Sequence, residues 1–239
     1  MANGTLYLLP ALLADAPPET VLPAGTLETM RGIRHFIVEE LRTARRFLIR
    51  AGIPVPIDDL QFMLFNEHSR DADLSTYLAP TLAGHDVGLL SEAGVPCVAD
   101  PGSRIVLAAH KAGIRVVPMT GPSSLLLALM ASGFNGQQFA FRGYLPTDKN
   151  LRTKKIREFE RVMHQENQTQ IFIETPYRNN HLLDALITAC QPSTLLCIAS
   201  GLTGSDESIA TRSIAEWRRQ RPDLQKTPAI FLIYMETGQ

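Results

Sequence analysis

Two hydrophobic periodicities alternate along the first half of the chain. Short apolar runs of strand-like composition occupy residues 5–9, 35–38, 62–65, 87–90 and 115–117. Apolar residues at helical spacing predict helices over residues 42–50, 74–82 and 104–111. Because the gaps between the strands are long enough to hold helices, this order predicts a wound, mainly parallel sheet.

The pattern changes after Pro118. A Thr-Gly-Pro turn leads into an apolar helix over residues 123–132, and further helices are predicted at 151–165 and 179–190. Strands are predicted at residues 138–141, 169–173, 194–199, 207–211 and 229–234. No helix fits between the strands at 194–199 and 207–211, so this pair is predicted to be antiparallel and the second sheet to be mixed.

These elements predict an α/β protein of two α/β domains, residues 1–118 and residues 119–239. The first domain has a mainly parallel sheet and the second a mixed one. A crevice between two domains is the default place for a ligand, so we expect an interdomain cleft.

Composition limits the function classes. The 239 residues are 45% hydrophobic and 20% charged, which excludes a disordered or fibrous chain. The net charge of −1 gives no basic shell, so any contact with nucleic acid needs a local patch. Two basic arrays could supply it or could be solvated helix faces: Arg31, Arg34, Arg42, Arg45, Arg46 and Arg50, and Arg152, Lys154, Lys155, Arg157 and Arg161.

Cysteine and histidine usage favours a reducing compartment and no metal. No two of the three cysteines form a C-x-x-C motif, and the six histidines are not spaced as metal ligands usually are. No apolar stretch approaches the roughly 20 residues of a membrane helix, and no basic segment followed by a long apolar run opens the chain. We therefore expect a cytoplasmic protein with no metal site and no membrane partner.

The segment at residues 89–102 is the most informative. It runs from a buried strand into a loop with two carboxylates, where Ala93 and Gly94 permit close backbone approach and Pro96 and Pro101 stiffen the chain. Ligands of open parallel sheets bind beyond the carboxyl ends of strands. The structural alternative is a tight loop in which Asp100 caps a helix that starts near Pro101.

Three further strand ends run into turns, at residues 118–124, 141–146 and 172–178. In the first, a helix N-terminus can bind a carboxylate, or its serines can act only as caps. A P-loop, a dinucleotide-binding fingerprint and a G-x-S-x-G elbow are all missing from the sequence.

Taken in order, these segments resemble the tetrapyrrole methylase superfamily of S-adenosylmethionine-dependent methyltransferases. The matching motifs are S-E-A-G-V-P (91–96), A-D-P-G (99–102), T-G-P-S-S (120–124), G-Y-L-P (143–146) and E-T-P-Y-R (174–178). They are most similar to the branch that methylates a ribose 2′-hydroxyl of small-subunit ribosomal RNA, which has S-D-A-G-T-P, D-P-G, P-G-P-x-A, G-F-L-P and E-x-P-H-R at these places. E-E-L-R (39–42) and N-E-H (66–68) extend the resemblance over about residues 5 to 235.

The resemblance implies a homodimer that binds S-adenosylmethionine in the interdomain cleft. The cofactor-binding residues it implies are Ser91, Glu92, Ala93, Gly94, Pro96, Asp100, Thr120, Gly121, Pro122, Ser123, Ser124, Tyr144, Leu145, Glu174, Thr175, Pro176, Pro228 and Ala229. Two places depart from the branch: residues 10–15 keep only the proline of P-T-P-I-G-N-L, and Gly201 and Gly204 replace the charged residues of E-L-T-K.

Methyl transfer chiefly requires alignment of donor and acceptor and exclusion of water. A carboxylate or histidine can take the proton of a ribose hydroxyl, and the candidates are Glu39, Glu67, His68, Glu92 and Glu174, each of which can also be a surface or capping group. The expected RNA contacts are Arg42, Arg45, Arg46, Lys154, Lys155 and Arg157.

Three hypotheses follow. The chain is a ribose methyltransferase acting on ribosomal RNA or the small ribosomal subunit, a methyltransferase of the same fold acting on a small molecule such as a tetrapyrrole, or a non-catalytic RNA- or ribosome-binding relative. The altered loop at residues 10–15 keeps the last two open.

Overall fold

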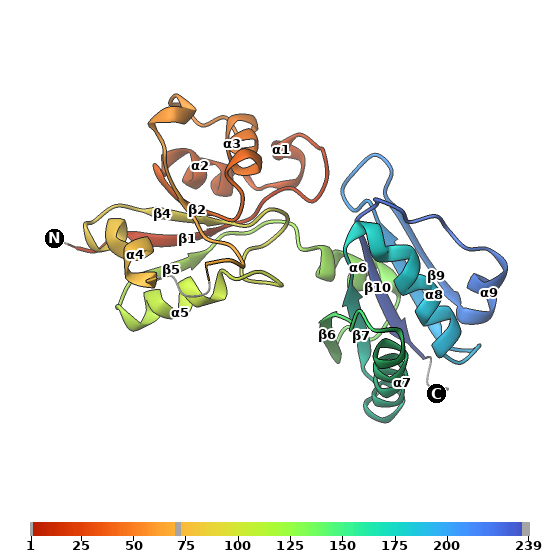
Figure 1. The fold of residues 1–239 in the computed structure, drawn as a ribbon. Helices are drawn as coiled ribbons and strands as arrows, with labels where there is room; N and C mark the ends of the chain where they lie inside the picture. Colours follow the sequence, from red (N-terminus) through yellow and green to blue (C-terminus); the bar gives the residue numbers. More distant parts are fainter. Residues whose placement is uncertain (1, 70–72, 236–239) are drawn as a thin grey trace. The chain divides into compact units, whose positions relative to one another are not determined.

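The computed structural model describes residues 2–69 and 73–235. Contacts between residues divide the chain into two compact units, Met1–Ser123 and Ser124–Gln239 (Figure 1). The predicted domain division after residue 118 stays a prediction. The two units are described one at a time below.

The first unit is built on a five-stranded parallel sheet. Its strands are β1 (Thr5–Leu9), β2 (His35–Val38), β3 (Gln61–Leu64), β4 (Val87–Leu90) and β5 (Arg115–Pro118), in the order β3-β2-β4-β1-β5. Every neighbouring pair is parallel. The predicted wound parallel sheet is therefore confirmed, with strand boundaries that differ by one residue at most.

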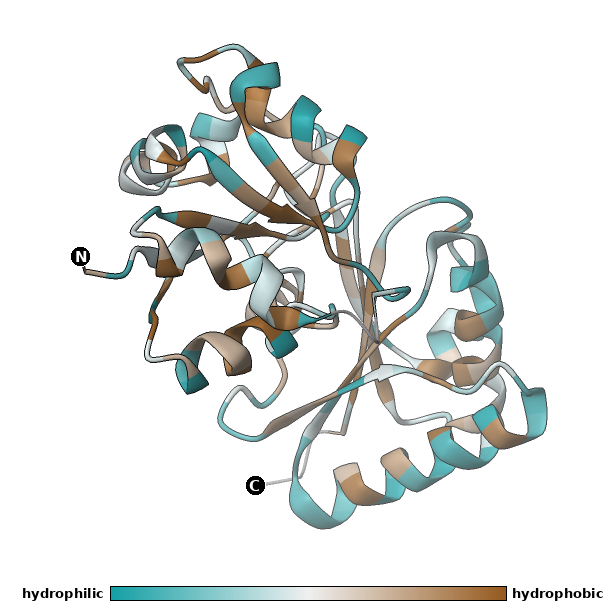
Figure 2. Ribbon diagram, turned by 60° about the vertical axis from the view of Figure 1, so that its left-hand side comes forward, coloured by the Kyte–Doolittle hydropathy of each residue, from teal (hydrophilic) through white to brown (hydrophobic). Residues whose placement is uncertain are grey.

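Helices cover both faces of this sheet. Helices α1 (Pro18–Val21), α2 (Ala24–Gly32) and α3 (Leu41–Arg50) lie on one face, and α4 (Leu74–Leu82) and α5 (Ser103–Lys111) lie on the other (Figure 1). Neighbouring residues of one strand point to opposite faces, so Phe36 packs in the cluster beneath α2 and α3 while Ile37 packs in the cluster beneath α4 and α5. The inner strands β2 and β4 are buried on both sides and consist of nearly continuous apolar residues, whereas the edge strands β3 and β5 are partly exposed (Figure 2).

Helix α3 positions several residues used below. Its buried side chains Ala44, Phe47 and Leu48 have the spacing that predicted the helix. Glu40 caps its first turn, because its carboxylate accepts hydrogen bonds from the backbone amides of Arg42 (2.9 Å) and Thr43 (2.6 Å). The helix thus begins directly after the residues that follow β2.

The second unit contains a mixed five-stranded sheet. Its strands are β6 (Phe139–Tyr144), β7 (Thr169–Ile173), β8 (Leu195–Ser200), β9 (Ser208–Ser213) and β10 (Ala229–Tyr234), in the order β6-β7-β10-β8-β9. Only β6 and β7 pair in parallel. The predicted antiparallel pairing of the strands near 194–199 and 207–211, and hence the mixed sheet, is confirmed.

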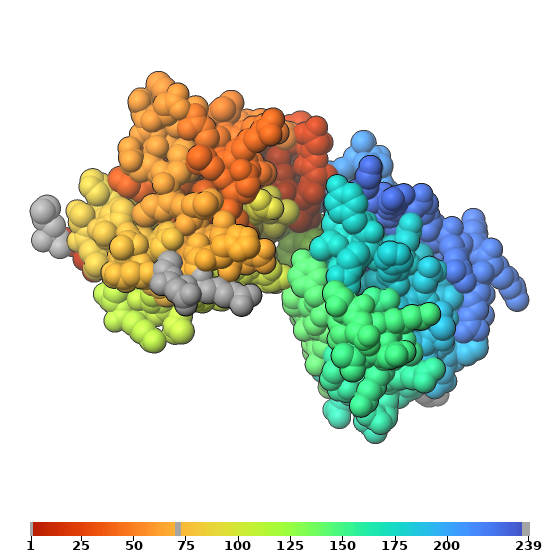
Figure 3. All heavy atoms as spheres, in the orientation of Figure 1, coloured from red at the N-terminus to blue at the C-terminus, as the bar shows by residue number. Residues whose placement is uncertain are grey.

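Four α-helices of this unit are α6 (Ser124–Ser132), α7 (Lys149–Glu166), α8 (Asn179–Ala189) and α9 (Ile214–Arg219). The core lies between the sheet and α7, α8 and α9, around Phe172, Trp217 and Phe231. Helix α7 lies at the surface of the unit, where its side chains are visible as green and teal spheres in Figure 3. Within the described residues, no helix is long and apolar enough to cross a membrane.

Some elements were not predicted from the sequence. They are α1, α2, α9 and two 3-10 turns, Ile57–Asp59 and Pro176–Arg178. Helix α9 carries a sequence signal that could have revealed it, since Ser213 and Glu216 form a reciprocal capping box. Helix α1 is a single turn of four residues, too short for a periodicity to be recognised.

Candidate functional site

The carboxyl ends of β1, β2 and β4 meet at one edge of the first sheet, because these strands are parallel. Residues 11–15, 39–40 and 91–93, which follow these strands, line a pocket with Thr43, Arg46, Phe47 and Arg50 of α3. Its volume is about 410 Å³, within the range of small-molecule sites. The pocket joins residues that are widely separated in the sequence.

Backbone packing at Gly94 holds two of these loops together. The Ala11 amide donates a hydrogen bond of 2.8 Å to the Gly94 carbonyl. Gly94 has φ of +71°, and an added Cβ would lie 3.1 Å from Leu13 Cδ2 and 3.3 Å from the Pro122 carbonyl oxygen. A side chain at this position is therefore both strained and crowded.

Gly121 makes a second close approach. A Cβ there would lie 2.2 Å from Cγ of Pro10, so the turn after β5 packs directly on the loop after β1. The Thr26 hydroxyl donates to the Thr120 carbonyl at 2.8 Å. Residues 120–122 thus brace the loops, and none of residues 120–124 lines this pocket.

Glu39 is the carboxyl group whose environment is most unusual. It is half-buried in the pocket wall, and burial, together with the nearby charges of Asp100 and Glu92, raises its pKa to about 7. A hydrogen bond from the backbone of Glu92 acts in the opposite direction. A carboxyl that titrates near neutral pH can accept a proton there, as a general base requires.

Asp100 stabilises the loop behind Glu39. Its carboxylate accepts hydrogen bonds from the amides of Cys97 (2.8 Å) and Gly102 (2.7 Å), across a stretch in which Cys97 and Ala99 have positive φ. Burial raises the pKa of Asp100 as well. The structural alternative of a tight loop therefore fits Asp100, although its carboxylate bonds to the amide of Gly102, the residue before α5, and to none of the amides of α5 itself, which begins at Ser103.

A second, much smaller cavity shares Glu39 and Ser91 with the lining of the pocket. It has a volume of about 10 Å³ and is lined by Glu39, Ser91, Pro96 and Asp100 among others. This is close to the space that one water molecule needs. Pro96 is buried here, and Ser91 directs its hydroxyl to the carbonyls of residues 93 and 94.

The other proton-acceptor candidates lie in different surroundings. Glu67 and His68 are exposed in the loop after β3, with their side chains 3.8 Å apart and 78% and 84% exposed, and neither lines the pocket. Glu92 lines the pocket but is exposed. Of the candidates in the first unit, only Glu39 is both in the pocket and half-buried.

The predicted site residues of the second unit gather at one edge of its sheet. The parallel strands β6 and β7 end at Tyr144 and Ile173, which are register partners, and β10 begins at the same edge. Residues 144–145, 174–176 and 228–229 are therefore neighbours. Tyr144 is exposed, whereas Leu145 and Ala229 are buried.

Glu174 differs from Glu39 in having a charged partner. Its side chain is only 2% exposed, and one carboxylate oxygen lies 2.8 Å from Nη2 of Arg178. The other accepts a hydrogen bond of 2.8 Å from the Thr175 amide. These contacts make Glu174 part of the turn that ends β7 rather than a proton acceptor open to a ligand.

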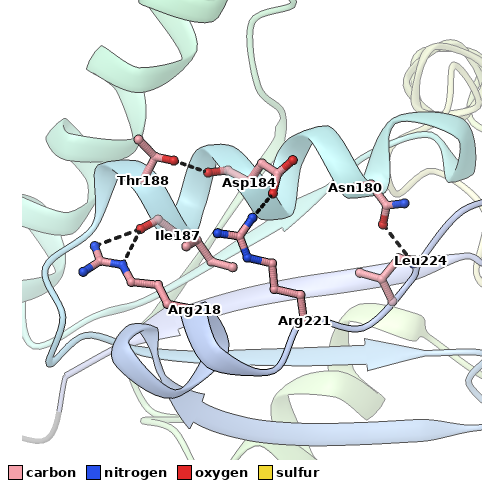
Figure 4. Close-up of polar contacts among 7 residues, drawn as sticks. All are labelled: Asn180, Asp184, Ile187, Thr188, Arg218, Arg221 and Leu224. Carbon is pink, nitrogen blue, oxygen red and sulfur yellow. Dashed lines mark hydrogen bonds and ion pairs between the residues drawn. The ribbon is translucent and has the colours of Figure 1, made fainter.

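Side chains of α8 hold the turn before β10 in place. The buried side chain of Asn179 donates to the Thr227 carbonyl at 2.6 Å. Figure 4 shows two further ties between α8 and the segment after α9: Asn180 accepts from the Leu224 amide at 2.9 Å, and Arg221 pairs with Asp184 at 2.8 Å. Sequence reasoning missed these residues, because nothing in their local pattern pairs them.

Comparison with known proteins identifies the family. The family described as Tetrapyrrole (Corrin/Porphyrin) Methylases matches residues 33–217. The chain belongs to this family. The predicted family, the two-sheet α/β fold and the enzyme class, a methyltransferase that depends on S-adenosylmethionine, are thereby confirmed.

Three relatives, each named Ribosomal RNA small subunit methyltransferase I, are similar over most of their length. The one from Vibrio cholerae is 26% identical over 99% of this chain and 81% of its own. The Xylella fastidiosa protein is 30% identical over 91% and 75%, and the Mesorhizobium japonicum protein is 34% identical over 87% and 68%.

The basic array of the first unit of this methylase divides between two roles. Arg46 and Arg50 line the pocket. Arg50 also pairs with Asp15 at 2.8 Å and donates to the Ala16 carbonyl at 2.7 Å, so it fastens the loop after β1 to α3. Arg45 is instead paired with an aspartate of the 57–59 turn and lies outside the pocket lining.

The array of the second unit divides in the same way. Lys154 and Arg157 line an open groove along α7, whereas Lys155 pairs with Glu158 at 2.9 Å and is absent from the groove lining. No cluster of three or more metal-ligating side chains occurs among the residues that the structure describes.

Proposed function

We propose that this methylase transfers a methyl group from S-adenosylmethionine to a ribose 2′-hydroxyl of small-subunit ribosomal RNA. The observation that carries the proposal is the similarity to relatives named for ribosomal RNA methylation, which extends over 99% of the chain and so includes the loops that line the pocket. The chain's own geometry supports the chemistry through Glu39.

The pocket suits the cofactor in size and in chemical character. Its volume of about 410 Å³ is ordinary for a ligand of this size. Ala93 lines the pocket with a small side chain that lets a ligand approach the backbone, and Glu92, which is exposed there, offers carboxylate oxygens to the positively charged amino group. S-adenosylmethionine supplies an electrophilic methyl group that is carried on sulfur.

We propose that Glu39 is the catalytic base. A ribose hydroxyl is a poor nucleophile unless its proton is removed as the oxygen–carbon bond forms. The raised pKa of Glu39, about 7, makes its carboxylate a better proton acceptor than an ordinary glutamate, while enough of it is ionised at neutral pH. The backbone hydrogen bond from Glu92 holds the group in place.

Other parts of the proposal rest on the predicted contacts. Among the six predicted RNA-binding cations, the proposal keeps Arg42, Arg46, Lys154 and Arg157, which form no ion pair with any described residue. That residues of both units contact one cofactor, and that the chain forms a homodimer, stay predictions. Light scattering at micromolar concentration measures the second.

A small-molecule acceptor is the competing function. It is favoured by the apolar residues 11–13, which line the pocket in the loop that departs from the ribosomal RNA branch. The two functions differ in what they require outside the pocket, because an RNA acceptor needs phosphate contacts and a small molecule does not.

The deciding experiment supplies labelled S-adenosylmethionine with small-subunit ribosomal RNA, the intact subunit, or tetrapyrroles. We expect label in RNA, recovered after nuclease digestion as a 2′-O-methylnucleoside. Label on a base would overturn the ribose assignment, and label only in tetrapyrrole would establish the competing function. Absence of transfer to any acceptor, although the cofactor binds, would contradict the proposal.

A further inference from the structure

Helix α7 has a buried side and an outward side of different composition. Ile156, Glu160 and Met163 are buried at helical spacing and face the core of the second unit. On the outward side, an open groove is lined by Lys149, Asn150, Thr153, Lys154, Arg157 and Arg161, together with Glu158. Figure 2 shows the hydrophilic side of this long helix in teal.

Four cations in this groove lack local partners. The charged side-chain groups of Lys149, Lys154, Arg157 and Arg161 form neither a hydrogen bond nor an ion pair with any residue that the structure describes. Glu158 is the groove's one carboxylate among those residues, and it is already paired with Lys155. That hydrogen bond lowers the pKa of Glu158, with smaller contributions from Arg161 and Lys154.

Helix stability does not explain this arrangement. Lys154 and Arg157 are three residues apart, and Arg157 and Arg161 are four apart, so like charges adjoin on one face, and each such pair destabilises a helix by about 0.2–0.5 kcal/mol. Glu158 is also three or four residues from Lys154 and Arg161, but this one carboxylate, already paired with Lys155, offsets only part of the repulsion. An anionic partner would reverse the sign of this contribution.

The spacing of the cations fits a row of anions better than a single anion. From Lys149 to Arg161 the helix rises about 18 Å, so the cations follow one another along the groove instead of converging on one point. Asn150 and Thr153 add neutral hydrogen-bonding groups between them. A nucleic acid strand, with one phosphate per nucleotide, complements such a row.

We propose that the α7 groove binds the phosphate backbone of RNA as a docking surface of this methylase. The inference rests on the proposed function for the identity of the RNA, and it adds Lys149 and Arg161 to the contacts while removing Lys155. Because the chain's net charge is −1, this row is a local source of attraction that overall charge does not provide.

The test compares two variants that each lose two positive charges. Lys154→Gln/Arg157→Gln alters the groove. The control, Lys111→Gln/Arg115→Gln, alters two exposed cations of the first unit that line neither the groove nor the pocket. The probes are a labelled single-stranded oligoribonucleotide, deproteinised small-subunit RNA and vesicles of anionic phospholipid, titrated without cofactor at several salt concentrations.

We expect the groove variant to bind both RNAs at least about fivefold more weakly at low salt, and the negative slope of log affinity against log salt to become shallower by about 1.4 for the single-stranded probe. The control should match the wild type. Equal slopes for the two variants, or a loss confined to the vesicles, would overturn the inference. Thermal melting confirms that both variants fold.

An assay of methyl transfer to ribosomal RNA distinguishes a failure of this inference from a failure of the proposed function. If the wild type methylates ribosomal RNA and the groove variant keeps its RNA affinity, the groove assignment alone fails. If the wild type transfers no methyl to RNA but the groove variant still loses RNA affinity and salt slope, the groove assignment stands and the proposed acceptor fails.

Discussion

Glu39 and Glu174 each follow a strand at the ligand-facing edge predicted for their sheet, yet their surroundings differ in one decisive respect. Glu39 is half-buried beside Asp100 and has no cation among the causes that set its pKa, which is raised to about 7. Glu174 is almost fully buried, and Arg178 neutralises it at 2.8 Å. Burial next to like charge creates a proton acceptor, whereas burial next to a cation creates a structural ion pair.

The two edges also differ in how their backbone is held. In the first unit, loops approach one another through glycines and the pocket remains open between them. In the second, Asn179 and Glu174 fix the turns through buried contacts. We infer that the first edge carries the reactive group and the second supplies a rigid surface, and each prediction below tests one side of this contrast.

The largest effect is expected from Glu39→Gln, which removes the proton acceptor and keeps the shape of the side chain. Methyl transfer should fall about 10²- to 10⁴-fold. The wild-type rate should rise with pH and level off above pH 7, where Glu39 is ionised, and this rise should vanish in the variant. Single-turnover rates from pH 5.5 to 8.5 measure both, with Glu67→Gln as an exposed control expected to be within twofold of wild type.

The same variant has a stability signature of opposite sign. A carboxyl whose pKa is raised by folding retains its proton between pH 4.5 and 7, where the unfolded chain releases it. Stability therefore falls as pH rises through this window. Glu39→Gln should stabilise the fold at pH 8 by about 1–2 kcal/mol, after allowance for solvent screening, and should change it little at pH 4. An equal effect at both pH values would contradict the raised pKa.

Glu174→Gln should act on stability and not on the pH profile. It leaves Arg178 beside a neutral group and should destabilise the fold by about 2–3 kcal/mol, since losing one partner of a buried pair leaves the other uncompensated. Calorimetry should show a drop in Tm of roughly 5–10 °C. A loss of the pH-dependent rise in rate, without loss of stability, would instead make Glu174 the base.

The sequence predicted the sheets and the residue types at their edges because apolar runs, turn residues and motif order are local signals. It did not distinguish Glu39 from Glu67 or Glu174, since burial and neighbouring charge arise from distant segments. The same limit applies to Lys154 and Lys155, which are adjacent in the chain although only Lys154 lines the groove of α7. It also applies to the ion pair between Arg50 and Asp15, which are 35 residues apart in the sequence.

A smaller effect should follow from Gly94→Ala, with Gly113→Ala as its matched control. Both glycines have positive φ, +71° and +67°, but only Gly94 has atoms within 4 Å of an added Cβ. Each variant should lose about 1–2 kcal/mol of stability from backbone strain. Cofactor affinity, measured by calorimetry, should fall about five- to tenfold for Gly94→Ala alone. Equal affinities in the two variants would place the cofactor away from this loop.

The smallest effect is expected from Arg50→Ala, which releases the loop after β1 from α3. Exposed ion pairs contribute only about 0–1 kcal/mol, so the fold should tolerate the change. Residues 11–15 line the pocket, and their loosening should raise the KM for S-adenosylmethionine about three- to fivefold while kcat stays within twofold. Arg45→Ala removes a comparable arginine–aspartate pair on the same helix, outside the pocket lining. If Arg45→Ala raised the KM as much as Arg50→Ala, the effect would come from α3 rather than from the loop. Partial rescue by Arg50→Lys would indicate that the positive charge at position 50 holds the loop.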